Sequence, residues 1–316
     1  MRTRTFGRLA WPVSEIGHGL WGMGGWTESD DDESQRAIER SITLGCTFFD
    51  TALAYGDGKS EQLLGAVLAR HRDAPLRIAT KIPPKNRKWP ADPADPLDEA
   101  FPPDHIRAAT EQSLEHLGLS SVDLQQFHVW TDAWTDDDRW VRAVEDLKRE
   151  GLIRAFGISV GRRRPYGVER ALRTGVVDAV QVVYNVFDQG AADDLFPLCR
   201  ELDVAVIARV PFDEGSLTGT LRRGQTWPEG DFRNSYFAAP KLDEALDRVD
   251  ALARDVPAGM TMPELALRFV LASPDVTTVI PGMRRPRHVE ANLAVSDGRS
   301  LPAALLDRLR VHRRDA

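Results

Sequence analysis

The stretch FFDTALAYGDGKSEQLLG, residues 48–65, contains one strand–loop–helix unit. Aromatic and small residues at 47–52 predict a strand that ends near Asp50, and residues 60–70 have the apolar spacing of a helix. The loop between them carries Tyr55, five residues after Asp50. A strand that passes through a short loop into a helix favours a parallel sheet built from repeated βα units.

The same unit recurs along the whole chain. Strands are predicted near residues 16–19, 47–52, 77–82, 122–129, 154–159, 179–185, 205–210 and 277–282. Helices are predicted near residues 31–44, 60–70, 104–117, 137–150, 166–174, 193–202, 262–272 and 287–295. Eight such units predict an α/β fold, a (β/α)8 TIM barrel, as a single domain over residues 1–316. An open doubly wound sheet is the structural alternative.

Two long loops interrupt this rhythm, at about residues 83–103 and 211–239. The first contains seven prolines, so neither a helix nor a strand is expected to run through it. Both follow predicted strands and would therefore cover the C-terminal mouth of the barrel, where loops carry function. Helices near residues 241–254 and 302–312 are predicted as additions to the eightfold repeat.

Composition excludes several classes of protein. The chain has 316 residues, 42% hydrophobic content and a formal net charge of -7, which argues against general nucleic-acid binding. Its two cysteines, Cys46 and Cys199, lack the spacing of a metal site and cannot form a disulfide framework. No apolar run has the length of a signal peptide core or a membrane span. We expect a cytoplasmic protein without a metal or a membrane partner.

Four polar residues follow separate predicted strands. Asp50, Lys81 and His128 each stand at a strand end, and Tyr55 stands in the loop after Asp50. A tyrosine can give a proton to the oxygen of a carbonyl group that is being reduced, and a nearby lysine is expected to lower its pKa. Asp50 would hold Lys81 in place, and His128 would orient the carbonyl. The set predicts carbonyl chemistry at the barrel mouth.

Two nucleotide-binding patterns fail on context. Residues 17–22 match G-x-G-x-x-G, but further glycines and an acidic run separate them from the next predicted helix. Residues 58–60 read Gly-Lys-Ser, but Leu53 stands where a phosphate-binding loop requires glycine. The sequence therefore predicts neither a dinucleotide fingerprint nor a P-loop.

The segments FFDTALAYGDGKSEQLLG (48–65), IATK (78–81) and LQQFHVW (124–130) resemble the aldo-keto reductase family. The resemblance runs from Ile16 to Asn292. It implies that Asp50, Tyr55, Lys81 and His128 form a catalytic set. It also implies NADPH-dependent reduction of an aldehyde or ketone to an alcohol, with NADP+ as the oxidised cofactor.

The resemblance extends to cofactor-binding positions. It assigns Ser159 and Gln181 to the nicotinamide carboxamide, although Val160 stands where the family commonly has asparagine. It assigns a loop to the nicotinamide ring and the pyrophosphate, through Arg209, Pro211, Ser216 and Leu217, where Arg209 replaces the usual aromatic residue. It assigns the adenosine end to Gly282, Arg284, His288 and Asn292, with Arg284 at the 2'-phosphate and Asn292 at the adenine.

Tryptophans after the strands suggest an aromatic substrate wall. Trp21 follows the first predicted strand, and Trp130 and Trp134 follow His128, so these three indoles are candidates for the wall around a small-molecule carbonyl substrate, with Trp21 and Trp130 expected to contact it. The loop tryptophans Trp26, Trp89 and Trp227 are further candidates for the wall. An alternative is an oxidoreductase of sugar or natural-product biosynthesis, acting on a sugar nucleotide through basic loop residues: Arg162, Arg163, Arg164, Arg222 and Arg223. A second alternative is a cofactor-binding regulatory subunit, a role some relatives have, but the complete catalytic set favours the enzyme.

Overall fold

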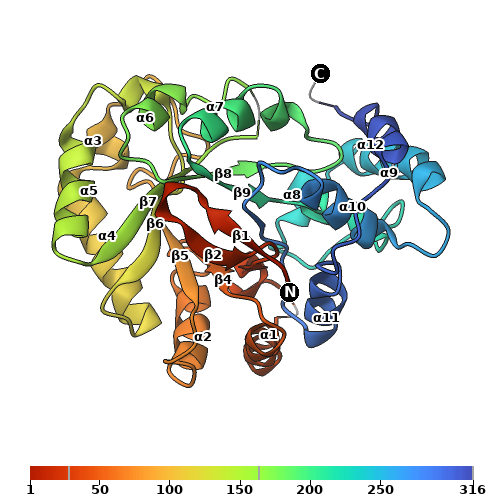
Figure 1. The fold of residues 1–316 in the computed structure, drawn as a ribbon, viewed down its shortest axis with the longest axis horizontal. Helices are drawn as coiled ribbons and strands as arrows, with labels where there is room; N and C mark the ends of the chain where they lie inside the picture. Colours follow the sequence, from red (N-terminus) through yellow and green to blue (C-terminus); the bar gives the residue numbers. More distant parts are fainter. Residues whose placement is uncertain (28, 163, 315–316) are drawn as a thin grey trace.

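Eight parallel strands follow one another around a single curled sheet in the order of the chain (Figure 1). The computed structural model describes residues 1–27, 29–162 and 164–314. The strands are β3 (His18–Gly19), β4 (Phe48–Asp50), β5 (Arg77–Ile82), β6 (Val122–Phe127), β7 (Ile153–Ser159), β8 (Ala179–Val183), β9 (Ala205–Arg209) and β10 (Thr278–Val279). Within the described residues, no helix is long and apolar enough to cross a membrane.

The sheet closes between its first and last strands. Ile16 forms a parallel bridge with Val279, and Gly19 forms one with Gly282. The backbone N–H of Gly19 donates to the carbonyl oxygen of Pro281 at 3.0 Å. A Cβ at Gly19 would lie 2.7 Å from the Ile280 carbonyl oxygen, so the strands approach too closely here for a side chain. The (β/α)8 TIM barrel is confirmed, and the open sheet is excluded.

Helices surround the barrel and connect its strands (Figure 1). They are α1 (Asp31–Thr43), α2 (Lys59–Leu68), α4 (Pro103–Leu117), α5 (Arg139–Arg149), α6 (Glu169–Arg173), α7 (Leu195–Glu201), α10 (Met262–Leu271) and α11 (Pro286–Leu293). The helices predicted outside the repeat are present as α9 (Lys241–Leu252) and α12 (Ala303–Arg310). The proline-rich loop holds the one-turn helix α3 (Leu97–Ala100), and the second long loop holds η5 (Asp213–Thr218) and α8 (Arg233–Tyr236).

An N-terminal hairpin, which the sequence analysis did not predict, covers one end of the barrel. Strands β1 (Thr3–Phe6) and β2 (Trp11–Ser14) pair antiparallel, and Phe6 and Val13 are fully buried. They join a cluster inside the barrel that includes Phe48, Ala79, Leu124, Ala155, Ala179, Ala205, Ile207 and Ile280. The hairpin lies at the N-terminal strand ends, because Arg8 N donates to the Asp203 carbonyl oxygen just before β9. The opposite end of the barrel, at the C-terminal strand ends, is not covered by the hairpin and is where the predicted catalytic residues lie.

The two long loops and the first βα loop cover that mouth. The hydroxyl of Thr27 donates to Asp231 Oδ2 at 2.5 Å, which joins the loop after β3 to the loop at 211–239. The second loop also has its own apolar cluster, made of Leu221, Phe237, Leu242, Ala245 and Leu246. Because this cluster includes residues of α9, the additional helix gives the loop a packed base.

Candidate active site

Lys81 lies at the centre of the predicted catalytic set. Its side chain is fully buried at the end of β5. The ammonium Nζ donates to Asp50 Oδ1 at 2.5 Å, to the Thr51 carbonyl oxygen at 2.7 Å and to Tyr55 Oη at 3.3 Å. Three acceptors thus satisfy its three protons. Lys81 therefore lies between Asp50 and Tyr55 and contacts both, as the sequence predicts.

Two glutamines fix the second oxygen of Asp50. Gln181 Nε2 donates to Asp50 Oδ2 at 2.8 Å, and Gln126 Nε2 donates to the same oxygen at 3.2 Å. Both side chains are buried and come from β8 and β6, which lie on either side of β7 in the sheet. The carboxylate therefore has partners on both oxygens, which offsets the cost of burying its charge. Gln126 is a supporting residue that the sequence analysis missed, although it stands two residues before His128.

The pKa of Tyr55 differs in direction from the sequence-based expectation. Burial raises the pKa of the phenol above its ordinary value, and the Lys81 ammonium lowers it without reversing the rise. Burial also acts on Lys81, but Asp50 and Tyr55 outweigh it and raise the pKa of the ammonium. At neutral pH the phenol therefore keeps its proton beside a permanent cation. That is the form a proton donor needs.

His128 follows β6 and faces Tyr55. The two ring centroids lie 5.6 Å apart in an edge-on arrangement, and Trp89 packs edge-on against His128 at 4.5 Å. Burial, followed by the charges of Lys81 and Arg209, holds the pKa of His128 well below its ordinary value. Its buried Nδ1 has no hydrogen-bond partner among the described residues. A neutral imidazole with an unused polar atom suits a contact with a polar ligand.

A cavity of about 1220 Å³ opens above these residues. Asp50, Tyr55 and His128 line it at the strand ends. So do most of the residues that the family resemblance assigns to the cofactor, namely Ser159, Gln181, Arg209, Pro211, Gly282, Arg284 and His288. Arg284 Nη1 donates to the Thr27 carbonyl oxygen at 3.1 Å. The cavity thus joins the predicted catalytic and cofactor residues.

A second cavity of about 580 Å³ contains the predicted adenosine end. Asn292 lines it, and Gly282 and His288 line both cavities. Two of the assigned side chains, Ser216 and Leu217, line neither cavity among the described residues. Ser216 is 1% exposed and donates to Asp213 Oδ2 at 2.7 Å, and Leu217 is fully buried. Their assignment to the pyrophosphate stays a prediction, although neither side chain faces a cavity in this structure.

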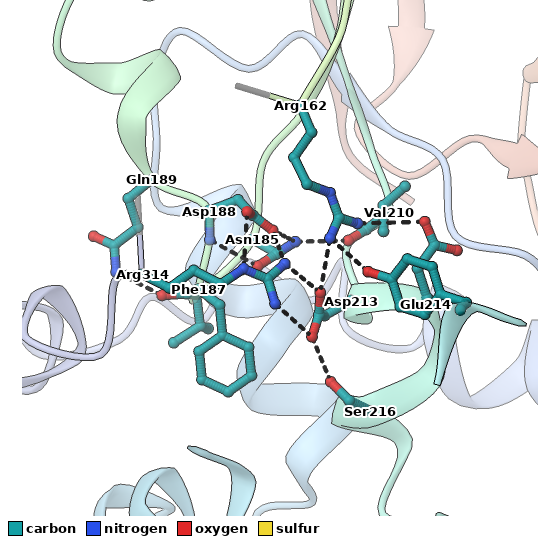
Figure 2. A network of polar contacts seen from close by, with 12 residues as sticks. Arg162, Asn185, Phe187, Asp188, Gln189, Val210, Asp213, Glu214, Ser216 and Arg314 are labelled. Atoms are coloured by element: carbon teal, nitrogen blue, oxygen red, sulfur yellow. Dashed lines mark hydrogen bonds and ion pairs between the residues drawn. The ribbon is translucent and has the colours of Figure 1, made fainter. Parts of the chain in front are cut away.

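A partly buried ionic network holds the loop after β9 (Figure 2). Arg314 Nη2 lies 2.6 Å from both Asp188 Oδ2 and Asp213 Oδ1, and so ties the C-terminal segment to two loops. Arg162 donates to Glu214 Oε1 at 3.3 Å and to the Tyr236 hydroxyl at 2.6 Å. Asp213 and Glu214 both have positive φ, 46° and 54°, which is unusual for residues other than glycine. The network fixes this conformation beside the large cavity.

Aromatic side chains form the outer wall of the cavity. Trp21 packs against Trp26 at 4.7 Å and against Phe232 at 4.9 Å, and it is 39% exposed. Trp89, which reaches His128 from the proline-rich loop, is 48% exposed. Trp130 touches the cavity but is 5% exposed and packs mainly in the core. Among the loop tryptophans, Trp26 and Trp89 line the cavity, whereas Trp134 and Trp227 do not. Phe232 packs against Trp21 without lining the cavity.

A buried lysine that joins a carboxylate to a tyrosine at the mouth of an α/β barrel defines a class of oxidoreductase. The model of the aldo/keto reductase family matches residues 15–313. The chain belongs to this family and is an NAD(P)H-dependent oxidoreductase.

Known relatives cover nearly the whole chain. An uncharacterized oxidoreductase of Bacillus subtilis is 26% identical over an alignment of 318 residues, which covers 99% of this chain and 96% of that protein. An NADH-specific methylglyoxal reductase of Escherichia coli is 27% identical over an alignment of 300 residues, which covers 89% of each chain. The cofactor in the second name shows that this level of similarity does not decide between NADH and NADPH.

Two solved structures have the same fold. The holo form of an aldo-keto reductase from Bacillus halodurans has a TM-score of 0.78 and 26% identity, covering 100% of this chain and 97% of that one. An aldo-keto reductase from Klebsiella pneumoniae in complex with NADPH has a TM-score of 0.70 and 26% identity. The match covers 98% of this chain and 95% of the Klebsiella pneumoniae chain.

The lowered pKa of His128 predicts a specific dependence of stability on pH. A histidine whose pKa is lower in the folded state stabilises the protein fully above its unfolded pKa, and this contribution is lost as the pH falls. Between pH 7 and pH 5, one such histidine lowers the free energy of unfolding by about 2 kcal/mol. His128→Gln should remove that part of the dependence.

Urea denaturation at both pH values measures the difference. Burial lowers the pKa of His18 to about 3, so His18 contributes equally to the wild type and to the variant. An unfolding free energy with the same pH dependence in both proteins would show that His128 is not held neutral by the fold.

Proposed function

We propose that this protein reduces an aldehyde or ketone to an alcohol, with NADPH as the cofactor and Tyr55 as the general acid. The observation that carries the proposal is the contact of Lys81 with both Asp50 and Tyr55, beside His128, on the wall of a cavity of about 1220 Å³. The chemistry of reduction needs a proton at the carbonyl oxygen as hydride reaches the carbonyl carbon. Tyr55 is the acid best placed for it.

The side chains of the site fit such a cofactor. Ser159 and Gln181 stand on adjacent strand ends, pair in register and both line the cavity. Buried polar atoms without partners in the described structure, Nδ1 of His128 and Nε of Arg209, lie at the same place. Bound NADPH would supply the hydride. The residues of this chain would hold the nicotinamide at the strand ends and the adenosine end near Arg284 and Asn292.

The proton transfer follows from the charges around Tyr55. The carbonyl oxygen accepts a hydrogen bond from the phenol, and His128 orients that oxygen from the other side. As negative charge develops on the oxygen, the proton of Tyr55 moves to it and leaves a phenolate beside the Lys81 ammonium. Asp50 keeps Lys81 charged and in place. The raised pKa of Tyr55 means that the proton leaves only when a stronger base, the developing alkoxide, is present.

The sugar-nucleotide alternative has less support. Its basic loop residues already have partners in this chain, because Arg162 contacts Glu214, Arg164 contacts Asp193, and Arg223 contacts Asp247. Arg222 donates to two backbone carbonyl oxygens. Arg163 lies outside the described residues. A regulatory subunit has no need for the complete catalytic set, so we retain the enzyme as the proposal.

Tyr55→Phe tests the role of the phenol. The variant keeps the ring but removes the acid, so turnover should fall by roughly 10²–10⁴-fold. The dissociation constant for NADPH should stay nearly the same. Turnover is measured by NADPH absorbance over a panel of aldehydes, ketones and keto-sugars. A variant with more than about a tenth of wild-type turnover, under conditions where chemistry limits the rate, would exclude Tyr55 as the acid.

Arg284→Ala tests the choice of cofactor. NADPH differs from NADH by a 2'-phosphate, which an arginine binds through charge-assisted hydrogen bonds. Such bonds contribute about 1.5–3 kcal/mol, so the variant should bind NADPH roughly 10- to 100-fold more weakly and NADH nearly as before. Titration by tryptophan fluorescence measures both constants. An equal loss for the two cofactors would place Arg284 at a part they share.

A further inference from the structure

Arg209 occupies an unusual position among the cofactor residues. It ends β9, and its Nη2 donates to the Val160 carbonyl oxygen at 2.9 Å. The guanidinium therefore reaches across β8 to the end of β7 and lies beside Ser159 and Gln181, the residues assigned to the nicotinamide carboxamide. It also lines the large cavity. Any ring held at those two strand ends would be close to this cation.

The charge of Arg209 is poorly compensated. Within the described residues it has no ion pair, and its buried Nε has no hydrogen-bond partner. Glu214 is the carboxylate that most favours the charged form of Arg209, but it accepts a hydrogen bond from Arg162 and none from Arg209 within the described residues. Burial, opposed mainly by Glu214, lowers the pKa of Arg209. A guanidinium remains charged at neutral pH, so Arg209 adds a positive charge at the strand ends that, unlike the charge of Lys81, has no ion-pair partner among the described residues.

This charge distinguishes the two oxidation states of a nicotinamide. In the reaction, one hydride leaves NADPH for the carbonyl carbon and one proton reaches the oxygen, giving NADP+ and an alcohol. The reduced ring is neutral, whereas the oxidised ring carries one positive charge. The family commonly has an aromatic residue at this position, and the face of an aromatic ring attracts a cation. Arginine reverses the sign of that interaction.

We propose that Arg209 makes the site bind reduced cofactor in preference to oxidised cofactor, and so directs the enzyme toward reduction. The inference rests on the proposed function, because it takes the nicotinamide site from it. A unit charge within about 12 Å of another changes a binding constant by about tenfold at an effective dielectric constant near 20. The two cofactors carry the same phosphates, so their ratio of affinities isolates the charge of the ring.

The test compares dissociation constants for NADP+ and NADPH, measured at equilibrium by tryptophan fluorescence without substrate. In Arg209→Met the ratio of the NADP+ constant to the NADPH constant should fall by about tenfold or more. Arg209→Lys keeps the charge and should keep most of the ratio. Arg200→Met is the matched control, because Arg200 is exposed near the end of α7, at the opposite end of β9. Its ratio should equal that of the wild type.

Glu214→Gln should shift the ratio of the NADP+ constant to the NADPH constant in the opposite direction. Removing the carboxylate that compensates Arg209 should raise the ratio, and Arg209→Met in the same background should cancel the rise. These opposite shifts separate an effect of charge from a general loss of packing, which would weaken both cofactors in both variants.

Three results would overturn the proposal. An unchanged ratio in Arg209→Met, with both cofactors equally weakened, would place Arg209 at the shared pyrophosphate. An unchanged ratio with a raised KM only for substrates that carry a carboxylate would make it a substrate-binding residue. A lower ratio in Arg209→Lys equal to that in Arg209→Met would exclude the charge as the cause. If wild-type protein binds neither cofactor, the proposed function itself fails.

Discussion

The ion pair between Lys81 and Asp50 is the interaction on which the rest of the site depends. Both side chains are almost completely buried, and an unpaired charge in such a place is strongly destabilising. The pair is stable because other groups complete it, with the Thr51 carbonyl oxygen on Lys81 and two glutamine amides on Asp50. The barrel supplies these partners by bringing β4, β5, β6 and β8 together around one interior.

The charge of Lys81 affects the protonation of the neighbouring side chains. It opposes the effect of burial on the pKa of Tyr55, and it helps to hold His128 neutral. Arg209 adds a second cation at the same mouth, where the pKa of His128 also responds to it. The site therefore combines a neutral acid, a neutral imidazole and two cations, an arrangement suited to negative charge that develops on an oxygen during the reaction.

The loops add a boundary to this interior. Arg314 and Arg162 form ion pairs with Asp213 and Glu214, the two residues with positive φ (Figure 2). Ion pairs, rather than regular secondary structure, therefore stabilise the cavity wall beside the strand ends. Trp21 and Phe232 close the outer side through aromatic contacts between two loops. Affinity for a particular carbonyl substrate should therefore depend on these loops, while the chemistry depends on the strand ends.

The sequence predicts the barrel and the positions of the catalytic set because both follow from local periodicity. The C-terminal ends of parallel barrel strands all lie at one mouth of the barrel. Residues at those ends, such as Asp50, Lys81 and His128, therefore lie near one another, as expected. Contacts between distant loops have no such signal. The hairpin that closes the barrel, the burial of Ser216 and the place of Trp89 depend on how long segments pack. The direction of the pKa of Tyr55 likewise depends on burial, which residue spacing does not give.

The most direct measurement of the central claim is a double-mutant cycle between Asp50→Asn and Lys81→Met. The readout is the single-turnover rate of hydride transfer with bound NADPH, measured on variants whose circular dichroism shows a folded barrel. If Asp50 acts through Lys81, the double variant should be about as slow as Lys81→Met alone. If the two losses multiply, each residue acts independently, and the account of the site as one coupled unit is contradicted.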